Sequence, residues 1–457
     1  MSKQKPSIPK GTRDFGPAEM AKRNYILNHI REVYRRYGYQ QLETPSMENL
    51  SVLTGKYGDE GDQLLFKILN SGDFLSKTRT TDYDKGAANL LPKIAEKGLR
   101  YDLTVPFARY VVMNQNEITF PFRRFQIQPV WRADRPQKGR YREFYQCDAD
   151  VVGTDSLTCE AEIVLMIEEV FQALGVVDIS IKINNRKILS GLVETVGAEG
   201  KESDLLVAID KLDKIGQEKV LAELEERGFS KEAIESLLPV FTLSGSNREK
   251  LQTVKNLLSQ SEEGLQGVAE IEEVIQRVQL MGSEAATLDF DITLARGLSY
   301  YTGAIFEVKA NNAVISSSIS GGGRYDNLTG VFGMPGMSGV GISFGVDRIY
   351  DVMEGLDLFP KENLAATQVL FIAFDDETEK HALSLLSQVR SAGISAEIYP
   401  DRVKLKKQFA YADKKGIPYT IVIGSDEVQK QAYGLKNLKT GEQEELDITQ
   451  IIERLKQ

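Results

Sequence analysis

Two strand-like segments joined by a short basic loop constrain the fold of this chain most strongly. They cover residues 122–130 and 143–152, and the loop residues 135–140 between them contain Pro and Gly, which is typical of a hairpin tip. Similar strand-like runs, such as residues 64–69, recur between residues 62 and 155 with few helices between them. This pattern predicts an antiparallel sheet rather than repeated strand–helix–strand units.

The remainder of the chain divides into helical and strand-like segments. Apolar spacing predicts helices over residues 17–38 and 156–174. Residues 201–285 are rich in Glu, Lys and Leu, and they predict an inserted helical domain. Residues 320–326 predict a glycine-rich turn, and residues 339–348 predict a strand that runs into a helix.

A C-terminal segment follows a boundary near residue 360. Strand-like and helical runs alternate in it, which predicts a small α/β domain with a parallel sheet. The expected fold class is therefore α+β, with an antiparallel sheet and flanking helices, a helical insertion and a C-terminal α/β domain. The expected divisions are residues 1–190, 191–285, 286–360 and 366–457.

Composition excludes several classes of protein. No run approaches about 18 consecutive apolar residues, so we expect no membrane span, and the N-terminus lacks the apolar region of a secretory signal. Cys147 and Cys159 are too few for a disulfide framework and lack zinc-site spacing, so we expect a reduced, cytoplasmic protein. The two histidines, His29 and His381, lie far apart in the sequence, which argues against histidine-based catalysis or a histidine-rich metal site.

Net charge says little about nucleic acid. The total of −10 argues mildly against a nucleic-acid-binding protein. Most of that charge, −7, lies in residues 201–285. Binding depends on where cations cluster, and they cluster elsewhere in this chain.

Residues 123–142 form the most unusual stretch, because they hold seven cations and one acid, Asp134. One interpretation is a solvated basic loop. The other is a polyphosphate site, because most of the cations are arginines, whose planar guanidinium binds phosphate through two hydrogen bonds. The chain has no G-x-x-x-x-G-K-[ST] loop and no dinucleotide fingerprint after a strand. If a nucleotide binds, arginines on a sheet hold it.

Other candidate residues are weak signals when taken alone. Arg296 and Arg348 could each be a surface arginine or half of an ion pair. The glycines at 321–323 could mark a flexible turn or a place where a ligand approaches the backbone. Asp102 and Asp150 could form structural ion pairs or recognise a cationic or amine-bearing ligand.

Taken in order, these segments resemble a class II aminoacyl-tRNA synthetase, and more narrowly the histidyl-tRNA synthetase family. The first helix, the following strand and Pro45 are similar to motif 1, residues 122–153 to motif 2 and residues 339–348 to motif 3. Arg296-Gly-Leu-Ser-Tyr-Tyr301 and Ser320-Gly-Gly-Gly-Arg-Tyr-Asp326 are similar to two signatures peculiar to the histidyl family. Ser299 departs from the Asp or Ala expected there.

The resemblance implies a histidine–tRNA ligase that uses ATP to form histidyl-adenylate, releases pyrophosphate and transfers histidine to the 3′ end of tRNA(His). It implies catalytic roles for Arg132 and Arg296 at the α-phosphate. It implies ATP binding by Arg132, Arg140, Arg296 and Arg348. It implies histidine binding by Asp102, Leu103, Thr104, Arg132, Gln146, Asp150, Arg296, Tyr300, Tyr301, Gly321, Gly322 and Gly323.

Within that set, Asp150 and Tyr301 are expected to contact the imidazole ring. Asp102, Thr104 and Gln146 are expected to hold the α-amino group. Mg²⁺ on the β- and γ-phosphates is implied, with no side-chain metal ligand assigned.

The resemblance also implies partners. It predicts a homodimer through motif 1 and a C-terminal anticodon-binding domain. The expected tRNA-binding residues are Gln137, Lys138, Arg140, Arg402, Lys406, Lys407 and Lys414.

Two alternatives remain open. One is a catalytically silent paralogue, such as the regulatory subunit of a histidine-biosynthetic phosphoribosyltransferase. The other is a synthetase-like RNA-binding module without chemistry. A class I synthetase is excluded, because its His-Ile-Gly-His and Lys-Met-Ser-Lys-Ser signatures are absent from the sequence.

Overall fold

The computed structural model describes residues 5–137, 139–198, 200–283, 287–295, 300–311, 314–360 and 367–456. The chain forms two compact units. One comprises Tyr25–Leu358 with the segment that ends at Asp14, and the other comprises Phe359–Gln457 with Phe15–Asn24. No helix in the described part of the chain is long and apolar enough to span a bilayer.

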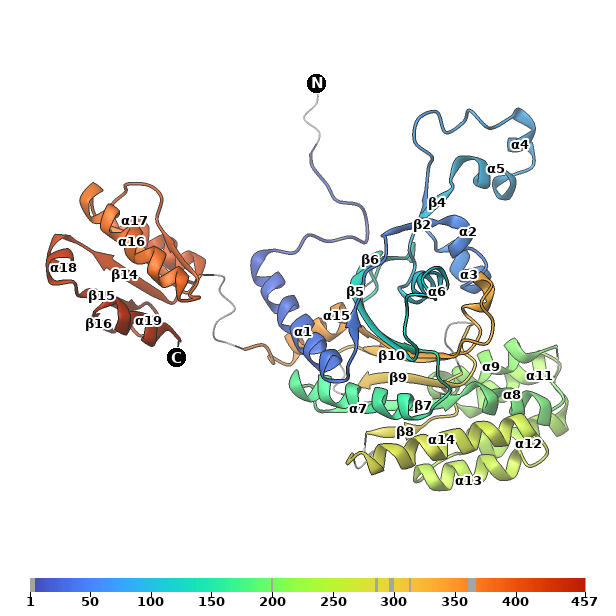
Figure 1. Ribbon diagram of the computed structural model, residues 1–457. Helices are drawn as coiled ribbons and strands as arrows, with labels where there is room; N and C mark the ends of the chain where they lie inside the picture. Colours follow the sequence, from blue (N-terminus) through green and yellow to red (C-terminus); the bar gives the residue numbers. More distant parts are fainter. Residues whose placement is uncertain are drawn as a thin grey trace. The chain divides into compact units, whose positions relative to one another are not determined.

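An eight-stranded sheet forms the centre of the first unit, in the order β1-β5-β6-β11-β10-β9-β7-β8. Figure 1 labels β5, β6, β7, β8, β9 and β10 of this sheet. Its neighbours pair antiparallel except β1 with β5 and β7 with β8. The predicted antiparallel sheet is therefore confirmed. The strands are β1 (Gln40–Gln41), β5 (Phe122–Trp131), β6 (Glu143–Val152), β7 (Ile179–Asn185), β8 (Leu288–Phe290), β9 (Ala304–Ala310), β10 (Ser320–Tyr325) and β11 (Gly339–Gly345).

The predicted hairpin is the longest pairing in this sheet. β5 and β6 pair over ten positions, from Phe122 opposite Val152 to Trp131 opposite Glu143. Side chains alternate between the two faces of a strand, so Arg124 and Gln126 share one face with their partners Asp150 and Asp148. We call this face the site face.

The predicted glycine-rich turn at residues 320–326 is wrong, because these residues form the central strand β10. β10 pairs with β11 on one side and β9 on the other. A Cβ atom on Gly322 would lie 2.0 Å from the carbonyl oxygen of Gly341. The glycines therefore let β10 and β11 approach closely, which is a strand role that a row of glycines does not reveal in the sequence.

Two helices pack on the opposite face of the sheet. Tyr34 of α1 (Pro17–Arg36) stacks near Phe125 and Phe344, with ring centroids 5.5 and 6.1 Å away. Phe171 of α7 (Thr158–Ala173) lies 5.6 Å from the Phe344 ring. Both helices were predicted from the sequence and are confirmed, and their packing leaves the site face available for a ligand.

The region between β1 and β5 is more helical than predicted. It holds a three-stranded sheet in the order β2-β4-β3 together with five helices. The run at residues 64–69 contributes only the two-residue strand β3, because Leu65 instead packs in a cluster with Leu50 and Leu53. Short apolar runs do not distinguish buried helix from strand. The elements are β2 (Met47–Asn49), α2 (Leu50–Leu53), α3 (Gly58–Gln63), β3 (Lys67–Ile68), α4 (Thr80–Asp84), α5 (Ala87–Ile94), β4 (Lys97–Leu99) and α6 (Thr104–Met113).

The predicted helical insertion is confirmed in type. All secondary-structure elements described between residues 201 and 283 are helices. The last of these helices, Glu262–Leu280, packs against α7 and α8 (Arg186–Thr195). The helices are α9 (Glu202–Asp210), α10 (Leu212–Ile215), α11 (Gln217–Glu226), α12 (Lys231–Phe241), α13 (Asn247–Leu257) and α14 (Glu262–Leu280). After β10 come a short 3₁₀ turn, Gly330–Phe332, and α15 (Val346–Gly355), which follows β11 as predicted.

The second unit contains a five-stranded sheet in the order β13-β12-β14-β15-β16. β13, β12 and β14 are parallel as predicted, but β15 and β16 add antiparallel strands, so the sheet is mixed. The hairpin of β15 and β16 is polar in its second strand, which removes the apolar signal of a buried strand. The elements are β12 (Val369–Ala373), α16 (Asp376–Ser391), β13 (Ala396–Ile398), α17 (Leu405–Lys415), β14 (Tyr419–Ile423), α18 (Ser425–Lys430), β15 (Tyr433–Asn437), β16 (Gln443–Leu446) and α19 (Ile448–Lys456).

Candidate active site

Two adjoining cavities open on the site face of the large sheet. The inner cavity has a volume of about 110 Å³ and the outer cavity about 520 Å³. The two share lining residues, so a ligand in one can contact a ligand in the other. The shared residues are Gln146, Tyr301, Gly321, Gly322 and Ser343.

Glycines form the floor of the inner cavity. A Cβ atom on Gly341 would lie 2.1 Å from Oδ1 of Asp150, and one on Gly323 would lie 3.0 Å from the Tyr301 ring. A Cβ atom on Gly321 would meet only a carbonyl oxygen, at 3.3 Å. Missing side chains thus make room both for the polar groups and for a ligand above the strand.

Asp102 is held in one orientation at the start of α6. Its Oδ1 accepts hydrogen bonds from the Tyr57 hydroxyl at 2.9 Å and the Val105 amide at 3.2 Å, and its Oδ2 accepts one from the Tyr300 hydroxyl at 3.1 Å. The side chain is buried, and that burial raises the pKa of Asp102 against the opposing effect of these donors. The carboxyl group is therefore preorganised to meet a cationic or amine-bearing ligand.

Asp150 faces the same cavity from β6. Nη2 of Arg124 lies 2.8 Å from its Oδ2, and the Tyr325 hydroxyl donates to its Oδ1 at 2.6 Å. Arg124 is fully buried, with its guanidinium carbon 4.2 Å from the centre of the Phe107 ring. Burial raises the pKa of Asp150 although Arg124 opposes the shift. Arg124 thus compensates a buried carboxylate instead of binding phosphate.

Asp148 is a site residue that the sequence analysis missed. It lines the inner cavity between Gln146 and Asp150, and it is 2% exposed. Within the described residues its Oδ1 has no hydrogen-bond partner, and burial raises its pKa to about 7. The alternation of polar residues at 146, 148 and 150 in an otherwise apolar strand is the signal that could have identified it.

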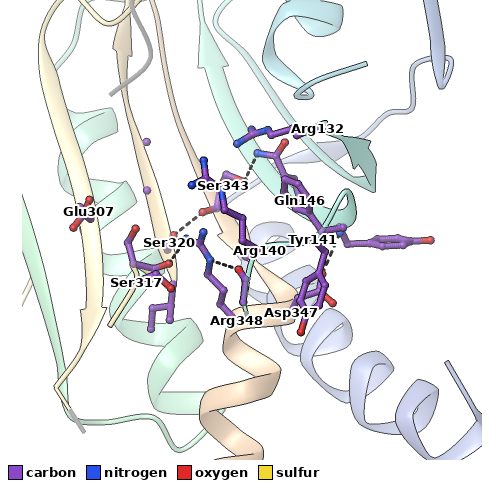
Figure 2. Close-up of a pocket in the computed structure, with 18 of the residues that line it drawn as sticks. Arg132, Arg140, Tyr141, Gln146, Glu307, Ser317, Ser320, Ser343, Asp347 and Arg348 are labelled. Carbon is purple, nitrogen blue, oxygen red and sulfur yellow. Dashed lines mark hydrogen bonds between the residues drawn. The ribbon is translucent and has the colours of Figure 1, made fainter. Parts of the chain in front are cut away.

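Three arginines line the outer cavity (Figure 2). Arg132 donates through Nε to the Tyr101 carbonyl at 3.0 Å, and Arg140 pairs with Asp134 at 2.8 Å. Arg348 donates to the carbonyls of Gly139, at 3.2 Å, and Ser318, at 2.7 Å. Burial lowers the pKa of Arg348, and the positive charges of Arg132 and Arg140 lower it further. The three cations therefore share one field, which favours a polyanion.

Two further arginines of the basic stretch make other contacts. Arg123 pairs with Glu162 at 2.6 Å on the other side of the sheet. Arg142 donates to the backbone carbonyls of Asp134 and Lys10, at 3.0 and 3.4 Å. Among the described cations of this stretch, Arg132 and Arg140 are the pair that lines the cavity.

Most of the residues predicted to bind histidine meet in the inner cavity. Leu103 is fully buried, and its carbonyl oxygen lies 3.4 Å from Arg124 Nη2. Arg132 lines the outer cavity, and Arg296 lies outside the described residues. The residues that line the inner cavity are Asp102, Thr104, Gln146, Asp150, Tyr300, Tyr301, Gly321, Gly322 and Gly323.

The residues predicted to bind tRNA fall into two groups. Gln137 lines the outer cavity and bridges to Arg140 through backbone hydrogen bonds of 3.1 and 2.9 Å. Lys138 lies outside the described residues. In the second unit Lys406, Lys407 and Lys414 of α17 are exposed, whereas Arg402 precedes this helix and pairs with Asp376.

Glu307 is the third acidic residue of the outer cavity and was not predicted. The other two acids pair with arginines, Asp134 with Arg140 and Asp347 with Arg13. Glu307, on β9, instead has its Oε1 3.5 Å from Nζ of Lys309. Figure 2 shows Glu307 on the side of the cavity opposite Arg132 and Gln146. No group of three or more His, Cys, Asp or Glu in the described residues could hold a metal ion by itself.

The architecture is that of a class II aminoacyl-tRNA synthetase, an antiparallel sheet whose open face carries an arginine-lined cavity beside a small polar one. A histidyl-tRNA synthetase family profile matches residues 11–79 and 87–349, and an anticodon-binding domain profile matches residues 368–457.

Individual relatives agree with these profiles. The histidine–tRNA ligase of Cytophaga hutchinsonii is 60% identical over 99% of this chain and 100% of its own length. That of Phocaeicola vulgatus is 61% identical over 96% of each chain. The crystal structure of histidyl-tRNA synthetase from Nostoc sp. PCC 7120 is 34% identical, covers 99% of each chain and superposes with a TM-score of 0.85. This chain belongs to the histidyl-tRNA synthetase family.

Proposed function

We propose that the inner cavity holds histidine and the outer cavity holds ATP during the reaction of this family. The chain is a ligase: histidine and ATP give histidyl-adenylate and pyrophosphate, and the histidyl group then passes to tRNA. One observation carries the assignment. The inner cavity, lined by three buried acids, adjoins the arginine-lined outer cavity at Gln146, Tyr301 and Gly321.

The charge of the inner cavity suits the histidine ammonium and ring. Asp102, Asp148 and Asp150 line it, and Arg124 pairs with Asp150. An ammonium group would offset this excess of acid, and imidazole offers a donor and an acceptor for polar groups on two sides. We assign Asp102, Thr104 and Gln146 to the α-amino group, and Asp150 and Tyr301 to the ring. A site built from buried polar groups rejects ligands that leave those groups unpaired.

The outer cavity suits the triphosphate. The histidine carboxylate attacks the α-phosphate, and the electron pair of the breaking bond leaves with pyrophosphate. Arg132, near the junction of the cavities, would stabilise the charge on the α-phosphate, and Arg140 and Arg348 would bind the β- and γ-phosphates. Arg296 is assigned to the α-phosphate from its signature. The reaction needs no nucleophile from the protein, because the carboxylate of the substrate histidine is the nucleophile.

Mg²⁺ fits the outer cavity as a partner of ATP. Mg²⁺ prefers oxygen ligands and is commonly held by one or two carboxylates together with substrate phosphates. Glu307 is the acidic side chain there that has no arginine partner within the described residues, so it would supply the protein ligand. The ion would neutralise phosphate charge that the arginines leave uncompensated.

The second unit is assigned to the tRNA anticodon. α17 packs on its sheet with Phe409 and Ala412 and leaves Lys406, Lys407 and Lys414 exposed. Such cations bind phosphates of a tRNA stem. Gln137, Lys138 and Arg140 would contact the acceptor end beside the outer cavity. The functional divisions are then 1–190 and 286–360 for catalysis, 191–285 as the insertion and 366–457 for the anticodon.

A homodimer is part of the proposal. The motif 1 resemblance carries this part of the proposal. Sedimentation equilibrium should give twice the chain mass of 51.0 kDa, and a monomer at micromolar concentration would contradict the proposal.

A reducing, cytoplasmic location is also proposed. Cys147 and Cys159 are both free and buried. Free buried thiols are ordinary in reducing compartments. Recovery of the activity in the cytosolic fraction, with both thiols titratable only after unfolding, is the expected result.

Paired substitutions test the division between the cavities. In histidine-dependent ATP–pyrophosphate exchange, we expect Asp150→Asn to raise KM for histidine and Arg348→Ala to raise KM for ATP, each by about tenfold or more. Arg123→Gln is the matched control, because Arg123 belongs to the same basic stretch but pairs with Glu162. The assignment is wrong if the two variants exchange their effects, or if the control changes either constant as much as they do.

A further inference from the structure

The segment from Lys10 to Arg13 contacts the loop between β5 and β6. The Arg142 amide donates to the Gly11 carbonyl at 2.8 Å, and Arg142 Nη1 donates to the Lys10 carbonyl at 3.4 Å. Arg142 also donates through Nε to the Asp134 carbonyl, at 3.0 Å. The segment is therefore fastened to the base of the loop that carries Arg140.

Gly11 is required for this close approach. Its φ of +88° lies in the left-handed region, which glycine adopts without strain. A Cβ atom there would lie 2.8 Å from Arg142 Cγ and 2.9 Å from Pro136 Cγ. The segment could not lie on the loop with a larger residue at this position.

Arg13 joins the loop to a second element. Its guanidinium carbon lies 3.3 Å from the centre of the Tyr141 ring, and its Nη2 forms an ion pair with Asp347. Asp347 lies in the first turn of α15, beside Arg348, and its Oδ2 accepts a hydrogen bond from the Tyr145 amide at 3.4 Å. The Asp347 side chain is 6% exposed. Such a part-buried, charge-assisted contact is stronger than a surface ion pair.

Tyr141 and Asp347 both line the outer cavity, as Figure 2 shows, whereas Arg13 does not line it. Arg140 directly precedes Tyr141, and Arg348 directly follows Asp347. One side chain from the N-terminal segment thus holds the neighbours of two arginines that come from different elements. The distance between Arg140 and Arg348 determines whether both guanidinium groups can reach one triphosphate.

We propose that Lys10–Arg13 acts as a strap, in which Arg13 is a positioning residue that holds the β5–β6 loop against α15. The strap maintains the spacing of Arg140 and Arg348 for the phosphates of ATP. This inference rests on the proposed placement of ATP in the outer cavity. It adds a determinant of ATP binding outside that cavity.

A split between the two Michaelis constants distinguishes this role from a general structural one. We expect Arg13→Gln to raise KM for ATP in histidine-dependent pyrophosphate exchange by about tenfold, with KM for histidine unchanged within about twofold. Arg13→Lys should recover part of the loss, because the ion pair with Asp347 remains while the planar stacking on Tyr141 is weakened. Gly11→Ala should raise KM for ATP as well, through the contacts with Pro136 and Arg142.

Two further variants complete the test. Arg36→Gln is the matched control, because Arg36 also pairs with a carboxylate, Glu169, at 3.2 Å on the same chain, and it should leave both constants unchanged. In the double variant Arg13→Gln and Asp347→Asn, KM for ATP should rise by less than the product of the two single-variant rises, because each substitution removes the same ion pair.

The possible failures are distinguishable. Absence of histidine-dependent exchange in the wild-type enzyme would overturn the proposed function. Normal wild-type exchange with an unchanged KM for ATP in Arg13→Gln would overturn the strap alone. An equal rise of both constants in Arg13→Gln would also overturn it, because that result indicates general loosening of the fold.

Discussion

The buried ion pair of Arg324 and Glu160 provides the sharpest prediction about stability. Arg324 of β10 donates to both carboxylate oxygens of Glu160 in α7, at 2.5 and 2.8 Å. The two side chains are 7% and 0% exposed. Arg324 also donates to Ser338 Oγ and to the Thr154 carbonyl. The pair therefore anchors the strand that forms the cavity floor to the helix behind the sheet.

Glu160→Gln removes the negative charge with little change of shape. It removes the nearer carboxylate of a buried guanidinium and leaves the more exposed Asp326, whose Oδ1 lies 3.6 Å from Arg324 Nη1, so it costs about 3 kcal/mol of unfolding free energy. The exposed pair of Lys77 and Glu96 is the matched control, because its side chains are 71% and 54% exposed. Loss of such a surface pair in Glu96→Gln costs about 0–1 kcal/mol.

Urea unfolding followed by tryptophan fluorescence measures both effects. Trp131, the single tryptophan, lies in β5, so its emission reports on the large sheet. We expect the midpoint to fall strongly in Glu160→Gln and little in Glu96→Gln. The double variant Glu160→Met and Arg324→Met should recover stability relative to Glu160→Gln, because the buried guanidinium is removed together with its buried partner. Equal shifts in the two single variants would refute this reasoning.

Three other predictions concern catalysis, pH dependence and tRNA. Arg296→Ala should abolish adenylate formation without unfolding the protein, and normal pyrophosphate exchange in this variant would remove Arg296 from the mechanism. Burial raises the pKa of Asp148 from 3.8 to about 7. Between pH 3.8 and about 7 the native state therefore keeps a proton on Asp148 that the unfolded state has lost. The unfolding free energy consequently falls as pH rises through this range. The wild-type unfolding free energy should therefore decline more steeply from pH 5 to 7 than that of Asp148→Asn, by up to about 1.4 kcal/mol per pH unit, and parallel curves from urea titrations would contradict this. Joint replacement of Lys406, Lys407 and Lys414 by Ala should weaken aminoacylation and flatten its salt dependence while leaving pyrophosphate exchange intact, and an unchanged salt slope would argue against phosphate contact.

The sequence predicted the elements whose local patterns agree with their tertiary roles. The β5–β6 hairpin alternates and has a turn-forming tip, and α1 and α7 carry apolar side chains at helical spacing. The glycines of β10 were misread as a turn, because their role depends on the close approach of β11 rather than on local preference. The strand β16 was missed because its residues are polar and largely exposed, so they carry no apolar pattern.

The site was predictable where motif residues carry their own chemistry. Asp102, Asp150 and the glycines at 321–323 line the inner cavity, and Arg132, Arg140 and Arg348 line the outer one, whereas their binding roles stay predictions. Asp148 was missed although the alternation of polar residues at 146, 148 and 150 in a predicted strand places it on the same face as Asp150. The basic stretch did not reveal which cations face the cavity, since Arg124 is distinguished from Arg132 only by burial and by its carboxylate partner.

The most direct test of the central claim is ATP–pyrophosphate exchange by the wild-type enzyme, measured with each of the twenty amino acids in turn. The account predicts exchange with histidine alone, because the inner cavity combines an acidic site for the ammonium group with polar partners for the imidazole ring. Exchange with another amino acid at a comparable kcat/KM, or none with histidine, would contradict the account.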